Sequence, residues 1–476
     1  MNAGNKYVSL SHKCEIMAFK YHKPTRDKCE VCEELDRTAT EKPIIRTYDG
    51  KASSANNHPF HNWYNFVLGY TPDFPLYIIN KYNITSEHTI LDPFMGTATT
   101  NVVAKEFCIP SFGVEANDYF IKVGKTKLTW NVDIEKVNRY FEEIRTRIYQ
   151  IANKYQFEDL DNNLFSKNNT LKPYTEFNTL RPEGLGTRYI SDKPFAKLMI
   201  IKQAINEVLN RNIQSEIDNF FHTAFTSIIV PSSNVSYGPG FGIKKARNDY
   251  DVFGIFERKV TRMLGDLNSV KDNKNRATPF KIIHGDSRKL STLLEASSID
   301  YIITSPPYPG DHEYTKYTKL ELMIEHNIIS KEDFRVIKKR MLVGSTTNIY
   351  KECNDRVAVT GNPLIVQITD EIQRRLDYDG ATSGYEKLYT KLIWEYFGGM
   401  AIVLSEALKV LKKGGKFSLL VSDSHAFKMV HIQTALILKD IALSLGYSDG
   451  LIELWQHKRS TSHRYNLREE ILTLTK

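Results

Sequence analysis

Five consecutive residues, Thr304-Ser305-Pro306-Pro307-Tyr308, combine groups that could hold a planar polar ligand. They follow the apolar run Ile299–Ile303, which predicts a buried strand. The strand must end abruptly, because two prolines fix φ, remove two N–H donors and bar a strand or helix from continuing. The carbonyl before them is free to accept, the Ser305 hydroxyl can accept or donate, and the Tyr308 ring offers an aromatic face. Such groups suit a planar group that carries an exocyclic amine, such as a nucleobase. An isolated Pro-Pro-Tyr is more often a plain turn, so this interpretation depends on the rest of the chain.

A second stretch, Leu91–Thr100, has the pattern of a strand end, a loop of small residues and a helix start. Such a loop lets a ligand approach the backbone closely and points helix N–H groups at it. The next expected strand, Ser111–Glu115, ends in an acid that can accept hydrogen bonds from ribose hydroxyls, as in other nucleotide-binding α/β folds. A tight turn without a ligand is the alternative for the loop alone. Together with Glu115, the loop favours a nucleotide-type cofactor.

These stretches resemble known motifs. Leu91–Thr100 resembles the cofactor motif of S-adenosylmethionine-dependent DNA amino-methyltransferases, and Thr304–Tyr308 resembles their catalytic motif. Residues 58–80 resemble the helix that closes over the methionine end of the cofactor. One departure is Ala98, which replaces the second glycine of the loop and is tolerable if its φ is negative. The resemblance covers roughly residues 58–130, 276–310 and 396–476.

The resemblance implies S-adenosyl-L-methionine as cofactor and a target base that leaves the stack. Ser305 and the Pro306 carbonyl would hold the target amine, and Tyr308 would stack on the base. Positioning of the amine supplies much of the rate, and no covalent enzyme intermediate is needed. The implied catalytic residues are Ser305, Pro306, Pro307 and Tyr308. The implied cofactor-binding residues are Asp92, Pro93, Phe94, Gly96, Thr97, Glu115, Asp286 and Thr304.

The expected fold is α/β: a Rossmann-like class I methyltransferase with a mixed sheet of about seven strands, helices on both faces and mainly helical insertions. The cofactor loop, Glu115, Asp286 and Ser305 would all follow the carboxyl ends of parallel strands, where open α/β sheets bind ligands. The expected parts are an N-terminal arm (1–57), a cofactor-binding half (58–130), a helical insertion (131–275), a catalytic half (276–310), a second insertion (311–395) and the rest of the sheet with a final hairpin (396–476).

The charge distribution favours a polyanionic partner only mildly, since the net charge is +8 and the pI is about 8.9. Residues 231–247 mix hydroxyl, amide, aromatic and basic side chains and could follow a phosphate backbone. Their alternative is a solvated loop, and the same holds for the basic stretch 457–464. The target-recognition region is expected in 131–275, with 311–395 as the rival. The predicted DNA contacts are Asn234, Tyr237, Lys244, Lys245, Arg247, Lys458, Arg459 and Arg464.

Serine at the first position of the catalytic motif, rather than Asp or Asn, resembles the group that modifies cytosine N4. We therefore expect a cytosine-N4 DNA methyltransferase of a restriction–modification system, with double-stranded DNA and a cognate restriction endonuclease as candidate partners. N6-adenine DNA methylation, RNA amino-methylation and a non-catalytic nucleic-acid-binding protein on a methyltransferase fold stay open. No cysteine follows a proline, which argues against the Pro-Cys nucleophile of ring-carbon methylating enzymes.

The N-terminal cysteines offer a possible metal site. Cys29 and Cys32 form a CxxC, and with Cys14 and His22 they could bind zinc tetrahedrally, although the spacing fits no standard ribbon. The alternative is a polar arm with ordinary thiols. No run approaches 18 apolar residues and the N-terminus lacks a signal-peptide pattern, so we expect a cytoplasmic protein that does not enter a membrane.

Overall fold

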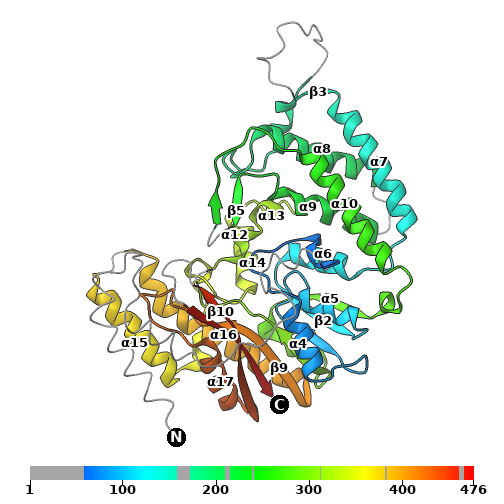
Figure 1. Cartoon of the computed structure of the whole chain (residues 1–476). Helices are drawn as coiled ribbons and strands as arrows, with labels where there is room; N and C mark the ends of the chain where they lie inside the picture. The colour runs from blue at the N-terminus through cyan, green and yellow to red at the C-terminus, as the bar shows by residue number, and fades with distance from the viewer. Residues whose placement is uncertain are drawn as a thin grey trace. The chain divides into compact units, whose positions relative to one another are not determined.

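The computed structural model describes residues 58–157, 172–209, 215–237, 241–310, 312–380, 383–459 and 466–476. The predicted N-terminal arm with Cys14, His22, Cys29 and Cys32 lies outside them, as does Arg464. The main sheet has seven strands in the order β10-β11-β9-β8-β1-β2-β7. Parallel and antiparallel pairs both occur in it, which confirms the predicted α/β fold with a mixed seven-stranded sheet (Figure 1).

The chain divides into two compact units. The N-terminal unit comprises residues 58–284 and 314–338, and the C-terminal unit comprises residues 285–313 and 339–476. Among the described residues, no helix is both long enough and apolar enough to cross a membrane.

The N-terminal unit holds three parallel strands. β1 pairs with β2, and β2 pairs with β7, so that Glu115 lies opposite His284 at the strand ends. Helix α5 packs on β1 and β2, and helix α6 packs on β2 and β7. The first part of this unit contains η2 (His61–Trp63), α4 (Asp73–Lys81), β1 (Ile90–Asp92), α5 (Thr99–Glu106), β2 (Ser111–Glu115) and α6 (Asp118–Leu128).

The second part of the N-terminal unit is mainly helical, as predicted for residues 131–275. The spacing of apolar residues predicts helices over 137–155, 195–209 and 216–229, which are present as α7, α8 and α9, whereas α10 and the small hairpin β5–β6 were not predicted. Its elements are α7 (Ile134–Ala152), β3 (Tyr155–Gln156), β4 (Lys172–Pro173), η4 (Tyr174–Leu180), α8 (Asp192–Leu209), α9 (Ser215–Ile229), β5 (Val235–Tyr237), β6 (Phe241–Ile243), α10 (Val252–Ser269), η5 (Lys274–Ala277), β7 (Phe280–His284), α12 (Tyr314–Tyr317), α13 (Lys319–Glu325) and α14 (Lys331–Arg340).

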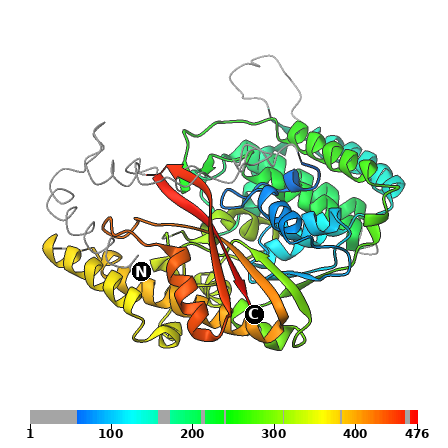
Figure 2. The ribbon, with the colours of Figure 1, turned by 60° about the horizontal axis from the view of Figure 1, so that its bottom comes forward.

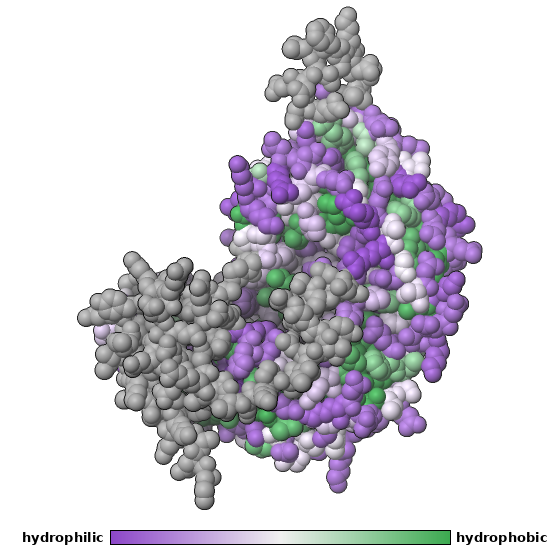
Figure 3. Space-filling model, viewed as in Figure 1, coloured by the Kyte–Doolittle hydropathy of each residue, from purple (hydrophilic) through white to green (hydrophobic). Residues whose placement is uncertain are grey.

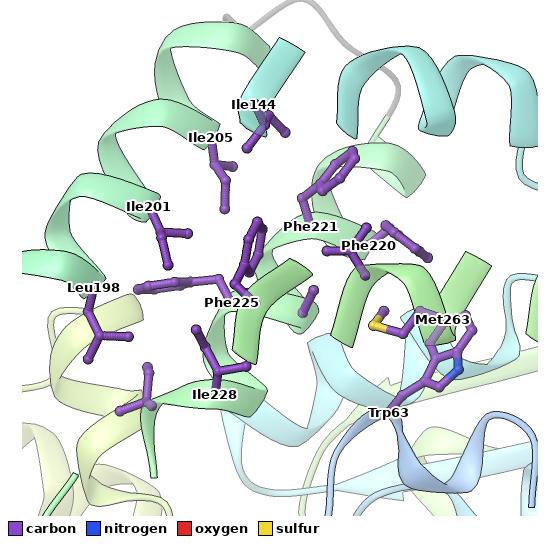
Figure 4. Close-up of a cluster of buried hydrophobic side chains, with 14 of the residues drawn as sticks. Trp63, Ile144, Leu198, Ile201, Ile205, Phe220, Phe221, Phe225, Ile228 and Met263 are labelled. Atoms are coloured by element: carbon purple, nitrogen blue, oxygen red, sulfur yellow. The ribbon is translucent and has the colours of Figure 1, made fainter. Parts of the chain in front are cut away.

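An apolar core fixes these helices. Phe225 on α9 lies among Leu198 and Ile201 of α8, and Trp63 lies beside Met263 of α10 (Figure 4). All five side chains are fully buried, and burying each stabilises the fold by roughly 1.5–3 kcal/mol. The outward faces of these helices are mainly hydrophilic in the view of Figure 3. The helical insertion is therefore a packed body that can carry surface loops.

The C-terminal unit holds the other four strands. β8 runs parallel to β9, β11 is antiparallel to β9, and β10 completes the predicted final hairpin with β11 (Figure 2). Helix α17 packs on β9, β10 and β11. The elements are η6 (Ser287–Lys289), α11 (Leu290–Leu293), β8 (Ile299–Thr304), η7 (Thr346–Asn348), η8 (Asp355–Val359), α15 (Pro363–Tyr378), η9 (Glu386–Leu388), α16 (Tyr389–Val410), β9 (Leu411–Ser422), α17 (Thr434–Leu445), β10 (Asp449–Arg459) and β11 (Asn466–Thr475).

Two expectations for this unit need correction. The glycine pair Gly414-Gly415 predicts a turn over residues 411–415 before a strand, but β9 already begins at Leu411, with Gly414 at a φ of 77° as an irregularity inside it. Helix α15 was not predicted, although Asn362 caps it through its side chain and Pro363 stands at its first position.

Candidate active site

The loop between β1 and α5 carries the predicted cofactor motif. Asp92, the last residue of β1, is fully buried. One carboxylate oxygen accepts the Phe94 N–H at 3.0 Å, and the other accepts the Tyr70 hydroxyl at 2.8 Å. Gly96 has a φ of 51°, a conformation that glycine adopts without a Cβ penalty. The loop packs closely on β2, since a Cβ on Gly113 would lie 2.5 Å from the Met95 sulfur.

Ala98 departs from the expected geometry. It was expected to be tolerable at negative φ, but it has a φ of 66° in the left-handed region, where it caps α5. This conformation costs an L-residue roughly 1–2 kcal/mol. Two short backbone bonds hold it, from the Ala98 N–H to the Met95 carbonyl at 2.8 Å and from the Val102 N–H to the Ala98 carbonyl at 2.9 Å. The loop thus keeps the shape of a glycine position while carrying a methyl group.

Glu115 ends β2 and ties the cofactor loop to the next strand. One carboxylate oxygen accepts the Gly96 N–H at 2.7 Å, and the other accepts the Asn117 N–H at 2.8 Å. Burial raises the pKa of Glu115 to about 7, although these N–H groups favour its charged form. Each oxygen keeps a second lone pair, so an ionised Glu115 can still accept a hydroxyl from a ligand.

Tyr70 is a site residue that sequence reasoning missed. Its hydroxyl bridges Asp92 and the Thr100 hydroxyl, which lies 2.6 Å away. Burial and the nearby carboxylate raise its pKa well above the usual value, so it stays a neutral donor. The only sequence signal was its position within residues 58–80, which were expected to lie over the cofactor.

A pocket of about 930 Å³ opens in the N-terminal unit. Tyr70, Thr97 and Thr99 of the cofactor loop region line it together with Lys244, Lys245 and other residues after β6. Its full lining is His61, Tyr64, Asn65, Phe66, Val67, Gly69, Tyr70, Thr97, Thr99, Ser227, Ile228, Val230, Pro231, Ser233, Val235, Ser236, Tyr237, Lys244, Lys245, Ala246, Arg247, Tyr250, Ile255, Lys259 and Glu321.

The predicted DNA contacts in residues 231–247 fall into two groups. Lys244, Lys245 and Arg247 are exposed, and within the described part of the chain none of them is paired with a carboxylate. Asn234, by contrast, is fully buried, and its side-chain amide oxygen accepts the Arg247 backbone N–H at 3.1 Å. Tyr237 donates its hydroxyl to the Tyr317 carbonyl at 2.8 Å. Asn234 and Tyr237 therefore hold the hairpin in place, and the three cations face solvent.

The Thr304–Tyr308 turn follows β8 in the C-terminal unit, as predicted. Thr304 is fully buried at the strand end, and Ser305 is half-buried. The Ser305 hydroxyl oxygen lies 3.0 Å from the Leu420 carbonyl and 3.0 Å from the Tyr308 hydroxyl. Within the described part of the chain, no backbone or side-chain donor bonds to the Pro306 carbonyl. The turn thus presents a serine hydroxyl and a carbonyl oxygen near an aromatic ring.

Lys458 makes an ion pair that the sequence did not indicate. Its ammonium group bonds to Glu469, which also accepts the Tyr308 hydroxyl at 3.3 Å. The predicted role of Lys458 in DNA binding stays a prediction. The side chain of Arg459, like all of Arg464, lies outside the described residues.

Asp286 follows β7 and is engaged by Arg288. Its oxygens accept the Arg288 side-chain N–H groups at 3.0 and 2.8 Å, and Arg288 also pairs with Asp355. Burial alone would lower the pKa of Arg288, but the Asp286 and Asp355 carboxylates raise it. The cofactor-binding role of Asp286 stays a prediction. No cluster of three or more metal-ligating side chains occurs among the residues that the structure describes.

Fold and strand-end residues together define the class: an α/β protein with the Rossmann-like fold of methyltransferases. No family model matches the chain. The chain is similar to the Type II methyltransferase M.BsoBI of Geobacillus stearothermophilus, at 21% identity over 90% of this chain and 88% of the relative. It is also similar to M.MvaI of Kocuria varians, at 20% identity over 74% of this chain and 73% of the relative. M.AvaI of Anabaena variabilis is 25% identical over 36% of this chain and 35% of the relative. These matches confirm the resemblance to restriction–modification methyltransferases.

Proposed function

We propose that this chain is a site-specific DNA methyltransferase that modifies the N4 amine of cytosine in a restriction–modification system. The observation that carries the proposal is the Ser305–Tyr308 turn directly after β8. It stands in a chain that is similar to a Type II methyltransferase over 90% of its length. Each chemical requirement of the reaction has a counterpart in the described residues.

The loop after β1 suits an adenosyl cofactor. Gly96 lets a ligand approach the backbone, and the Glu115 carboxylate has lone pairs left for ribose hydroxyls. Tyr70, Thr97 and Thr99 bring hydroxyl groups to the adjoining pocket. Pro93 and Phe94 complete the proposed neighbours in this unit, and Asp286 and Thr304 stay predicted cofactor-binding residues. S-adenosyl-L-methionine, when bound, supplies an electrophilic methyl group.

The turn after β8 suits the target amine. The Pro306 carbonyl can accept one amine hydrogen and the Ser305 hydroxyl can accept the other, which aims the nitrogen lone pair away from both. Pro306 and Pro307 hold this geometry because their φ angles are fixed. Tyr308 supplies the aromatic face. Positioning of this kind supplies the larger part of the rate in a direct transfer.

The three exposed cations Lys244, Lys245 and Arg247 are the proposed contacts to the DNA backbone. Phosphate contacts of this kind supply affinity that depends on salt and not on sequence. Asn234, Tyr237, Lys458, Arg459 and Arg464 stay predicted DNA contacts, and Lys458 stands on β10. A cognate restriction endonuclease and a cytoplasmic location complete the proposal, because such a methylase protects the DNA of its own host.

The test is nucleoside mass spectrometry on unmodified genomic DNA after incubation with the protein and S-adenosyl-L-methionine. We expect N4-methylcytosine, and we expect none from Ser305→Ala, while the matched control Ser444→Ala on α17 stays active. Detection of N6-methyladenine instead would support the same mechanism with adenine as the target base. Methylation of tRNA instead of DNA would support an RNA enzyme. Cofactor binding without any product on either substrate would contradict the enzymatic proposal.

A further inference from the structure

A chain of polar groups in the C-terminal unit leads away from Ser305. The Ser305 hydroxyl oxygen lies 3.0 Å from the Tyr308 hydroxyl, which lies 3.3 Å from a Glu469 carboxylate oxygen. Glu469 stands on β11, opposite Ser422 of β9, and is only 2% exposed. Buried carboxylates of this kind are retained where their lone pairs are satisfied. The partners of Glu469 therefore decide what it can do.

Two residues of β10 bond to the Glu469 carboxylate. The Lys458 ammonium bonds to the same oxygen that accepts the Tyr308 hydroxyl, and the Gln456 amide donates to the other oxygen. Lys458 is the one charged group that is seen to face Glu469 within the described residues, and its side chain is 45% exposed. The Glu469 carboxylate is thus fixed in orientation, and the ammonium group of its partner Lys458 reaches water.

The hydrogens along this chain can take two arrangements. Ser305 and Tyr308 have two hydroxyl hydrogens for three contacts: the Leu420 carbonyl, the contact between the two hydroxyls, and Glu469. In one arrangement, Ser305 donates to Leu420 and Tyr308 donates to Ser305. In the other, Ser305 donates to Tyr308 and Tyr308 donates to Glu469. The second arrangement leaves both lone pairs of the Ser305 oxygen open to an amine.

We propose that Glu469 is the final acceptor of a proton relay, Ser305–Tyr308–Glu469, that removes the extra proton from the amine as it is methylated. This inference rests on the proposed function and assigns a role to a residue that lies far along the chain from the catalytic motif. Ser305 touches the amine and is the catalytic residue. Tyr308 and Glu469 act through it, so Glu469 is a positioning and proton-accepting partner.

The methyl transfer and the loss of the amine proton conserve atoms and electrons. The amine nitrogen donates its electron pair to the methyl carbon, the carbon–sulfur bond breaks, and its electrons neutralise the sulfonium. One N–H proton passes to the Ser305 oxygen, the Ser305 proton passes to the Tyr308 oxygen, and the Tyr308 proton passes to Glu469. Glu469 becomes a neutral acid beside Lys458, whose exposed ammonium offers a route by which the proton returns to water.

The test is the pH profile of the single-turnover methylation rate in Glu469→Gln. A general base of this kind contributes about 10²–10⁴-fold, so we expect a rate about 100-fold lower near pH 7 with unchanged affinity for cofactor and DNA. Because the proton must then leave to solvent, the rate of the variant should rise with pH and with imidazole concentration. A variant with wild-type rates at all pH values would overturn the relay.

Two further variants separate the relay from a structural role. Tyr308→Phe removes the middle hydroxyl but keeps the ring and the Glu469–Lys458 pair. The double variant Tyr308→Phe, Glu469→Gln should be no slower than the slower single variant, since one relay is broken in each case. Additive losses that do not change with pH would overturn the relay. Glu470→Gln, next on β11 and paired with Arg468 at 2.7 Å, is the matched control. A wild-type protein without any activity would instead overturn the proposed function.

Discussion

The loop after β1 and the turn after β8 both follow parallel strands, but they hold their polar groups in different ways. In the loop, Asp92 and Glu115 accept hydrogen bonds from backbone N–H groups, which cannot move without moving the fold. In the turn, the Ser305 and Tyr308 hydroxyls contact each other and can exchange hydrogens. The loop after β1 is therefore a rigid set of hydrogen-bonding groups, whereas hydroxyl protons can move in the turn after β8.

The difference suggests that the loop and the turn have separate roles. A fixed set of donors and acceptors loses little entropy when it binds a cofactor, whereas mobile hydroxyl hydrogens suit a reacting amine. Substitutions in the loop should then change cofactor affinity, and substitutions in the turn should change the chemical step.

Asp92→Ala should weaken S-adenosyl-L-methionine binding about 100-fold. It leaves the Phe94 N–H and the Tyr70 hydroxyl without their buried partner, which costs roughly 1–3 kcal/mol for each group. Titration calorimetry measures the affinity. Tyr70→Phe, which keeps the carboxylate and loses only its hydroxyl partner, should lose about tenfold. Equal affinity in Asp92→Ala and wild type would remove the loop from the cofactor site.

Replacing Lys244, Lys245 and Arg247 together by Ala should weaken DNA binding and flatten its salt dependence. Each lost phosphate contact lowers the slope of log K against log salt by about 0.9, so three contacts give about 2.7. Fluorescence anisotropy between 50 and 200 mM salt measures the slope. The triple variant Lys136, Arg139 and Arg145 to Ala on α7 is the charge-matched control. The same slope in both triple variants would place the DNA elsewhere.

Cofactor affinity should rise about tenfold from pH 6 to pH 8 through Glu115. Its pKa is about 7, and its ionised form accepts ribose hydroxyls more strongly than the neutral acid does, so the tighter-binding form grows from about one tenth to about nine tenths. Calorimetry at several pH values should show this rise in the wild type and a flat profile in Glu115→Gln. Glu321, whose pKa burial also raises to about 7, provides the control Glu321→Gln. A profile that is flat only in that variant would assign the effect to Glu321.

The raised pKa of Glu115 makes the folded state less stable as the pH rises, whereas cofactor affinity should increase over the same pH range. A carboxyl whose folded pKa lies above its unfolded value of about 4.5 favours the folded state below that value. This contribution is lost as the pH rises towards 7, up to about 3 kcal/mol. Without cofactor, Glu115→Gln should therefore lose less stability than the wild type between pH 5 and pH 8. Chemical denaturation at each pH measures the difference, and identical curves would contradict the burial of this carboxyl.

Ala98→Gly should stabilise the protein by about 1 kcal/mol. Ala98 has a φ of 66°, and glycine adopts this conformation without the Cβ penalty, although it gains some entropy in the unfolded chain. The control is Ala104→Gly inside α5, which should destabilise by about 1 kcal/mol. Thermal unfolding measures both, and a destabilised Ala98→Gly would show that the loop is unstrained.

The two regions also differ in how far the sequence revealed them. Asp92 and Glu115 have partners within about 20 residues along the chain, so the loop pattern and the acid at the end of β2 could be predicted. Ser305 and Tyr308 have partners at Leu420 and Glu469, more than 100 residues away. No local pattern connects them, because the final hairpin brings them together only in the folded sheet.

In the helical insertion, too, only the features that depend on neighbouring residues in the sequence could be predicted. Helices α8 and α9 could be predicted because their apolar residues recur at helical spacing. The β5–β6 hairpin could not, because Asn234 and Tyr237 hold it through contacts to Tyr189 and Tyr317 on other elements. Ala98 was correctly singled out as the departure, but its φ depends on the packing of the loop and not on its residue type alone.

The central claim, that the loop binds the cofactor and the turn performs the transfer, is tested most directly in Ser305→Ala. We would measure its S-adenosyl-L-methionine affinity by calorimetry and its single-turnover methylation of cytosine N4 in the same preparation. We expect an unchanged affinity and a methylation rate at least 100-fold lower than that of the wild type. Full methylation by Ser305→Ala, or a loss of cofactor binding equal to the loss of rate, would contradict it.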